Sequence, residues 1–173
     1  ANLTNAKLRK ATLVNVSLKK AKLRRAVLTK ANLTNADLKR ANFSSANLEE
    51  ANLYKASLIS AKLRKADLTR AYLKNADFKK ANLTSANLNG ANLRNTNFFR
   101  ADLTRANLSN ADLTGSNLSN SDLSYANLKN ANLSKANLSG ANLYGLSGTK
   151  LFSCPELLPE EWQCNSEKYL LKL

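Results

Sequence analysis

The sequence predicts an all-β solenoid, in which the chain winds around one axis and joins successive coils through parallel β-ladders. Three observations support this prediction. Residues 1–145 divide into 29 five-residue units without an insertion, every unit has Leu or Phe at its centre, and 25 units have Ala two positions earlier. The last 28 residues lack this repeat, so we expect residues 146–173 to form a separate C-terminal cap.

A period of five fits neither a helix nor a straight strand. In an α-helix five residues advance by about 500°, so successive central leucines would step by roughly 140° and form no stripe. In a strand the side chains alternate, and an odd repeat would send successive leucines to opposite faces. The chain must therefore turn after each unit, which directs Ala and Leu to a shared axis and leaves the other three positions in water.

The polar positions of the unit fit such turns. Asn or Asp precedes the central residue in 21 of the 29 units, and we expect these side chains to stack in ladders along the axis. The second position after the centre holds Gly90, Gly115, Gly140 and Gly145. Glycine at this one position indicates a tight or left-handed turn at the end of each unit.

The A(N/D)LXX run resembles the pentapeptide repeat proteins over 145 of the 173 residues. The resemblance implies a right-handed quadrilateral parallel β-helix with four units in each coil, and thus roughly seven coils in the rod. Three units that lack Ala, at Val16, Thr96 and Ser116, are spaced by multiples of twenty residues, which fits a coil of that length.

The C-terminal segment is expected to cap the last coil, because an open end exposes unpaired backbone and apolar side chains. Ser153, Pro155 and Glu156 are typical of a helix start, and Pro159 with the glutamates after it is typical of a second one. We therefore expect a short α-helix within residues 155–163. Three apolar side chains of this helix should cover the coil: Leu157, Leu158 and Trp162.

Cys154 and Cys164, the only cysteines, flank this segment. They could form a disulfide that stabilises the cap by up to about 3 kcal/mol, remain two buried thiols, or form half of a metal site. Zinc needs about four ligands and the chain has no His, so we expect no metal. Of the other two arrangements we expect the disulfide, with two buried thiols as the alternative. A disulfide would indicate an oxidising compartment.

The pattern CPxxLPxxWxC resembles the tails of cyanobacterial members of the family. It implies a periplasmic or thylakoid-lumenal location, with the cytoplasm as the alternative. No stretch approaches 18 consecutive apolar residues, so we expect no transmembrane helix. The sequence begins at Ala1 inside a repeat without a visible signal peptide, and we expect either a processed or a trimmed chain.

The net charge of +15 is concentrated in the first half of the chain. Residues 1–80 contain 19 Lys and Arg against 5 Asp and Glu, whereas residues 81–145 contain 5 against 3. This asymmetry favours either the solubility of a long exposed surface or attraction to nucleic acid, anionic lipid or an acidic protein. With a period of twenty, basic pairs form a possible anion ridge along two adjacent faces: Lys19, Lys20, Arg24, Arg25, Lys39, Arg40, Arg64, Lys65, Lys79 and Lys80.

No catalytic residue and no cofactor site are expected. The chain lacks His, the usual general base at neutral pH, and has no Gly-rich phosphate loop. The acidic pair Glu49 and Glu50 lies at two outward positions, which favours a solvated pair over a catalytic one. The prediction is therefore a non-enzymatic scaffold with a protein partner, and the alternative is an anionic partner bound to the ridge.

Some pentapeptide repeat proteins are implied to inhibit DNA gyrase by imitating duplex DNA. That mimicry requires an acidic rod, whereas residues 1–80 carry a net charge of +14. The charge of the rod therefore disfavours gyrase inhibition by this chain.

Overall fold

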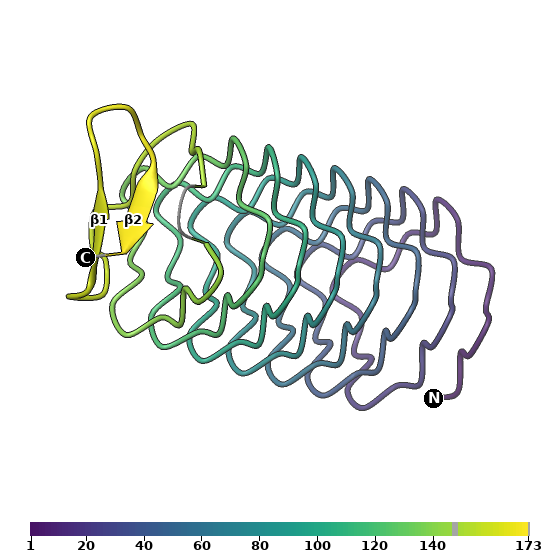
Figure 1. Cartoon of the computed structure of the whole chain (residues 1–173). Helices are drawn as coiled ribbons and strands as arrows, with labels where there is room; N and C mark the ends of the chain where they lie inside the picture. The colour runs from purple at the N-terminus through teal and green to yellow at the C-terminus, as the bar shows by residue number, and fades with distance from the viewer. Residues whose placement is uncertain (147–148, 173) are drawn as a thin grey trace.

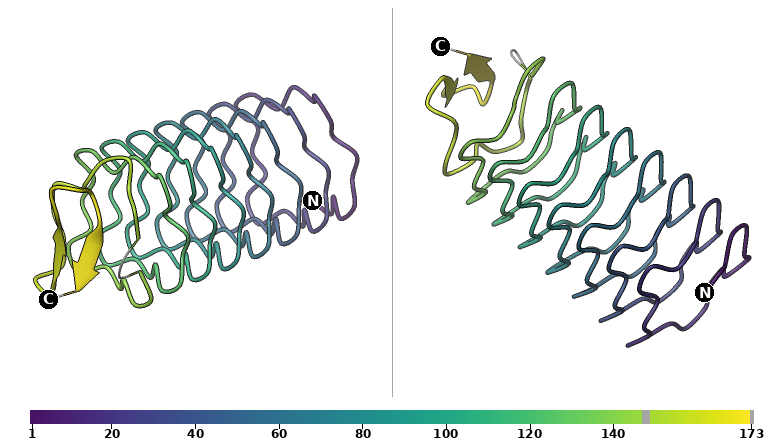
Figure 2. Two further views of the ribbon diagram at one scale, coloured as in Figure 1. Left: turned by 45° about the horizontal axis from the view of Figure 1, so that its top comes forward. Right: turned by 90° about the horizontal axis from the view of Figure 1, so that it is seen from below.

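The computed structural model describes residues 1–146 and 149–172. The chain winds into a rod of stacked coils, with the N-terminus at one end and a two-stranded hairpin at the other (Figure 1). The hairpin consists of strands β1 (Trp162–Cys164) and β2 (Leu170–Lys172), which pair in antiparallel fashion. Successive coils lie directly over one another along the rod (Figure 2).

Each coil contains four units and twenty residues. The residue before the centre of a unit forms a parallel bridge with the residue twenty positions later, as Asn2 does with Lys22 and Lys22 with Asn42. The coil length implied by the family resemblance is thereby confirmed, and the structure is a β-helix with four short sides. Residues twenty apart therefore form columns along the rod.

Backbone hydrogen bonds hold the coils together. The N–H of Leu83 donates to the carbonyl of Asp102 in the next coil (2.7 Å), and the carbonyl of Leu83 accepts from the N–H of Ala86 across the corner (2.9 Å). The N–H groups one position before and two positions after the centre also donate to neighbouring coils. Four of the five N–H groups in such a unit thus have backbone partners, and only the one after the centre does not.

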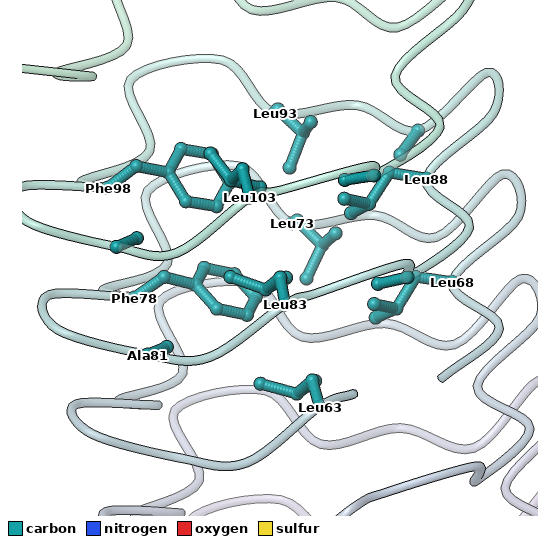
Figure 3. Close-up of a cluster of buried hydrophobic side chains, with 14 of the residues drawn as sticks. Leu63, Leu68, Leu73, Phe78, Ala81, Leu83, Leu88, Leu93, Phe98 and Leu103 are labelled. Carbon is teal, nitrogen blue, oxygen red and sulfur yellow. The ribbon is translucent and has the colours of Figure 1, made fainter. Parts of the chain in front are cut away.

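The core is a column of Ala and Leu side chains along the axis (Figure 3). From Ala21 onward the central residues of the rod are fully or almost fully buried, and the rings of Phe78 and Phe98 stack at a centroid distance of 5.1 Å. The central leucines of the first coil, such as Leu3, are only partly buried, since a described coil covers them on one side alone. The inward direction predicted for Ala and Leu is confirmed.

Every unit ends with a residue in the left-handed conformation. The second position after the centre has φ between 54° and 61° in 25 non-glycine residues and between 65° and 81° in the four glycines. The left-handed turn predicted from the glycines is confirmed and extends to all 29 units. Such a φ disfavours most side chains, so the hydrogen bonds around each corner must stabilise it.

The predicted α-helical cap is wrong, since no helix occurs in residues 1–146 or 149–172. Pro159 has no N–H to donate to the carbonyl of Pro155, and its ring would clash with that carbonyl in a helix. The segment instead extends the ladder. The N–H of Leu133 donates to Ser153 (3.1 Å), and the N–H of Leu138 donates to Leu157 (2.9 Å).

The side chains expected to cover the last coil differ in their burial. Trp162 is buried and Leu158 packs against the core, but Leu157 is 47% exposed because its extended segment directs it outward. Cys154 and Cys164 form a disulfide with their Cα atoms 6.0 Å apart, which joins this segment to β1. Among the residues that the structure describes, no helix has the length and apolar character required to cross a bilayer.

Candidate functional site

The predicted basic pairs lie at two neighbouring corners of the rod. We call the column of residues 19–20, 39–40, 59–60, 79–80 and 99–100 the first basic corner. The column of residues 24–25, 44–45, 64–65, 84–85 and 104–105 is the second basic corner. One side of the rod, which includes Lys22 and Lys62, separates them.

The first basic corner contains a hollow of about 270 Å³ between Lys19, Lys20, Lys39, Arg40 and the smaller pair Ile59 and Ser60. An acid lies beside it, because Asp37 Oδ2 is 3.1 Å from Lys19 Nζ and 3.7 Å from Lys39 Nζ.

Partial burial raises the pKa of Asp37, but hydrogen bonds from Lys19 and the Lys39 backbone and the charges of both lysines outweigh it and hold the pKa below its ordinary value. Asp37 therefore stays ionised at neutral pH and neutralises part of the first basic corner.

The second basic corner contains a larger hollow, of about 470 Å³. It is lined by Asn42 and two small side chains of the same coil, Ser44 and Ser45. Long basic side chains of the coils on either side also line it: Arg24, Lys62, Arg64 and Lys65. No carboxylate lines this hollow, so four cations surround it without a neutralising partner.

Lys62 was not part of the predicted ridge. The ridge was read from adjacent basic pairs at the two positions after the centre, whereas Lys62 precedes the centre. Lys22 is its equivalent two coils earlier, and both replace the usual Asn or Asp of the repeat. The units AKLRR and AKLRK, which are forty residues apart and share this Lys, could have revealed the site from the sequence.

Asn and Asp before the centre have a second role in addition to the predicted ladders. The ladders are present, as when Asn107 Nδ2 donates to Asn87 Oδ1 (3.1 Å). In addition, all 21 of these side chains accept a hydrogen bond from the N–H two residues later, as Asn82 Oδ1 does from Thr84 (3.1 Å). This Asx cap supplies an acceptor for the N–H of the residue after the centre, which is the one N–H of the unit without a backbone partner.

Eight units of the rod have no Asn or Asp at this position. Within residues 1–146, the N–H after the centre of these units donates to no protein acceptor. The residues concerned are Arg9, Val14, Lys19, Arg24, Thr29, Ile59, Arg64 and Lys74. Four of them lie in the two basic corners, so free backbone donors and basic side chains occur together there.

The acidic pair of the rod lies against a basic side chain. Glu49 and Glu50 bind Arg70 at the rod surface, with Arg70 Nη2 2.8 Å from Glu49 Oε1 and 3.0 Å from Glu50 Oε1. No group of three or more His, Cys, Asp and Glu residues that could hold a metal occurs over residues 1–146 and 149–172.

Comparison with known proteins gives a consistent family match. The family described as pentapeptide repeats matches in eight copies over residues 1–40, 36–75, 76–115 and 111–151. No curated protein matches the chain.

Solved structures of pentapeptide repeat proteins are similar to this chain. One is HetL from the cyanobacterium Nostoc sp. strain PCC 7120, which is involved in heterocyst differentiation regulation. The match has 34% identity, covers 87% of this chain and 83% of that chain, and has a TM-score of 0.50. A second is full-length QnrB1, a plasmid-mediated fluoroquinolone resistance protein, with 21% identity, coverage of 92% and 79%, and a TM-score of 0.43.

Proposed function

Since the chain belongs to the pentapeptide repeat family, we propose that it is a non-enzymatic scaffold that presents one side of a regular rod to a protein partner. The observation that carries this proposal is the fixed placement of its surface residues. Each outward side chain belongs to a column set by parallel backbone pairing, and most corners are also held by an Asx cap. A partner would therefore meet a surface that needs little ordering on binding.

A test of the scaffold role uses one coil in which all four corners are accessible. A photo-crosslinking amino acid is placed singly at four exposed, equivalent positions of this coil: Asn95, Arg100, Arg105 and Asn110. Tyr125 occupies the equivalent left-handed position three units after Asn110, so an aromatic side chain is tolerated at such a position. A scaffold should give one protein adduct from one or two adjacent corners, whereas equal adducts from all four corners would contradict it.

A second candidate function is the binding of an anionic partner at the basic corners. The hollow of the second basic corner supports it, because four cations line the hollow and no carboxylate does. Contacts with several phosphate or sulfate groups make binding steeply dependent on salt. The positive charge of this surface also argues against imitation of duplex DNA.

Heparin chromatography tests this second candidate. The protein should be retained at low salt and eluted at moderate salt. A variant with the hollow cations Arg24, Lys62, Arg64 and Lys65 changed to Ser should elute earlier. A second variant, with Lys19, Lys20, Lys39 and Arg40 changed to Ser, tests the first basic corner in the same way. Tight retention that persists in this variant would mean that the first basic corner does not take part.

We further propose that the protein resides in an oxidising compartment, either the periplasm or the thylakoid lumen. The disulfide between Cys154 and Cys164 supports this location, because such bonds are rare where thiols are kept reduced. Thiol labelling of acid-quenched cells tests the proposal. Two labelled cysteines would place the protein in a reducing compartment, and none would agree with the disulfide.

A further inference from the structure

Two units of the second basic corner share a sequence pattern that departs from the repeat. Residues 21–25 read AKLRR and residues 61–65 read AKLRK, so each has Lys in place of the capping Asn or Asp and a basic pair at the corner. They lie two coils apart in the same column, at a separation of about 10 Å. The unit between them, residues 41–45, reads ANFSS and keeps its Asn.

The middle unit shows what the two flanking units lack. Asn42 Oδ1 accepts from the N–H of Ser44 at 3.0 Å and from the hydroxyl of Ser44 at 2.7 Å. In the flanking units a lysine takes the place of this Asn, and the N–H groups of Arg24 and Arg64 donate to no atom of residues 1–146 or 149–172. A vacant acceptor position beside a free donor and several cations favours an oxyanion.

We propose that the second basic corner binds a tetrahedral oxyanion, phosphate or sulfate, which takes the place of the missing Asx cap. In the unit of Arg64, an anion oxygen accepts from the backbone N–H, and the Lys62 ammonium and the corner cations neutralise its charge. The unit of Arg24 has the same sequence pattern, and Arg24 lines the same hollow. The inference rests on the second candidate function and deepens it by naming the anion and its donors.

The unit at residues 6–10 explains why the pattern alone is not sufficient. It also reads AKLRK, but it lies at a different corner. The residue above Lys10 in the next coil is Lys30, which binds Glu50 at 3.3 Å. That carboxylate already supplies negative charge to the column, whereas no carboxylate lines the hollow beside Arg64.

Titration with sodium sulfate, followed by amide chemical shifts at constant ionic strength set with sodium chloride, tests the site. We expect saturable shifts of the Arg64 and Arg24 amides. The amides of Thr104 and Ser124, which lie further along the same column and already donate to Asp102 and Asp122, should show no saturable change. Shifts that grow linearly with sulfate at every basic residue would overturn the proposal, because they would indicate only a diffuse counterion atmosphere.

The variant Lys62→Asn provides the decisive comparison, since it restores the cap found in the other units. It should weaken sulfate binding at Arg64 by about tenfold or more without lowering the denaturation midpoint. The control Lys129→Asn removes the same charge at a distant corner, where the N–H already donates to Asn127 (3.0 Å), and should leave binding unchanged. Equal sulfate affinities of Lys62→Asn and Lys129→Asn would overturn the proposed site.

Two further probes distinguish the source of the anion. Saturable binding of both O-phosphoserine and inorganic phosphate would support the site and indicate that its ligand is a phosphate monoester on a larger molecule. Binding of inorganic phosphate but not of O-phosphoserine would support the site and indicate that its ligand is the free ion. Absence of any saturable shift, together with salt-sensitive retention on heparin, would overturn the site and leave the second candidate function intact.

Discussion

Replacing Ser57 with Asn should stabilise the rod, because it would add a cap to a corner that lacks one. Asn97, two coils further along the same column, shows the expected geometry. Its Oδ1 accepts from the N–H of Phe99 at 3.1 Å, and its Nδ2 donates to Asp77 Oδ1 at 3.0 Å. In Ser57→Asn the same groups would reach the free N–H of Ile59 and the carboxylate of a neighbouring coil.

The expected gain follows from these two hydrogen bonds. Each contributes about 1 kcal/mol net, and fixing the Asn side chain costs part of this, so the free energy of unfolding should rise by about 1–1.5 kcal/mol. For a chain of this length that corresponds to an increase in Tm of roughly 2–6 °C. Guanidinium denaturation followed by circular dichroism, with thermal melts in parallel, measures both quantities.

The control for this experiment is Ser57→Ala. The Ser57 hydroxyl makes no hydrogen bond within residues 1–146, so its removal should change stability by less than about 0.5 kcal/mol. If Ser57→Asn were no more stable than Ser57→Ala, the Asx cap would not be a stabilising element of the corner. The reasoning on the missing caps would then fail as well.

The remaining predictions concern the core and one ion pair. The buried hydroxyl of Ser116 has no hydrogen-bond partner among the described residues, so Ser116→Ala should raise the free energy of unfolding by about 1 kcal/mol. The equally buried Ser121 donates to a backbone carbonyl at 2.6 Å, so Ser121→Ala should not stabilise the fold; urea denaturation compares the two. Leu83 is completely buried, and Leu83→Ala should cost about 3 kcal/mol by leaving a cavity, as measured by the same method. Because the pKa of Asp37 is lowered in the folded state, its ion pairs contribute above the unfolded pKa of about 3.9 and are lost as the pH falls through the folded pKa. Asp37→Asn should therefore be less stable by under about 1 kcal/mol at pH 7 and by nearly nothing at pH 2; thermal melts that show a constant difference over this range would contradict the ion-pair explanation.

The architecture of the rod could be predicted from the sequence because one short pattern fixes the environment of every residue. The spacing of Ala and Leu determined which side chains point to the axis, and Phe78 and Phe98 occupy the central position as Leu does. The number of units per coil came from the family resemblance, since local spacing alone does not determine the angle of each turn.

The tail could not be predicted in the same way. Ser153, Pro155 and Glu156 provide helix-start signals that depend only on neighbouring residues. The last coil provides a competing edge of unpaired N–H groups, including that of Leu138, and the tail satisfies them in an extended form. Tertiary hydrogen bonding therefore outweighs local preference in this segment.

The candidate site was predicted only in outline. The corner cations of the second basic corner, such as Arg64 and Lys65, were found from their charge and spacing. To predict the role of Lys62 one must know which N–H of the unit lacks a backbone acceptor, and only the hydrogen bonds between coils reveal that. A pattern of charges thus locates a surface but does not show where its backbone donors are free.

The twenty-residue coil also limits how such a gene can change in length. Duplication of a single five-residue unit would leave the interior unchanged but rotate everything downstream by a quarter turn. Arg64 and Lys65 would then no longer stand in line with Arg24 and Arg25. Only a duplication of a whole coil would lengthen the rod and keep its surface pattern aligned.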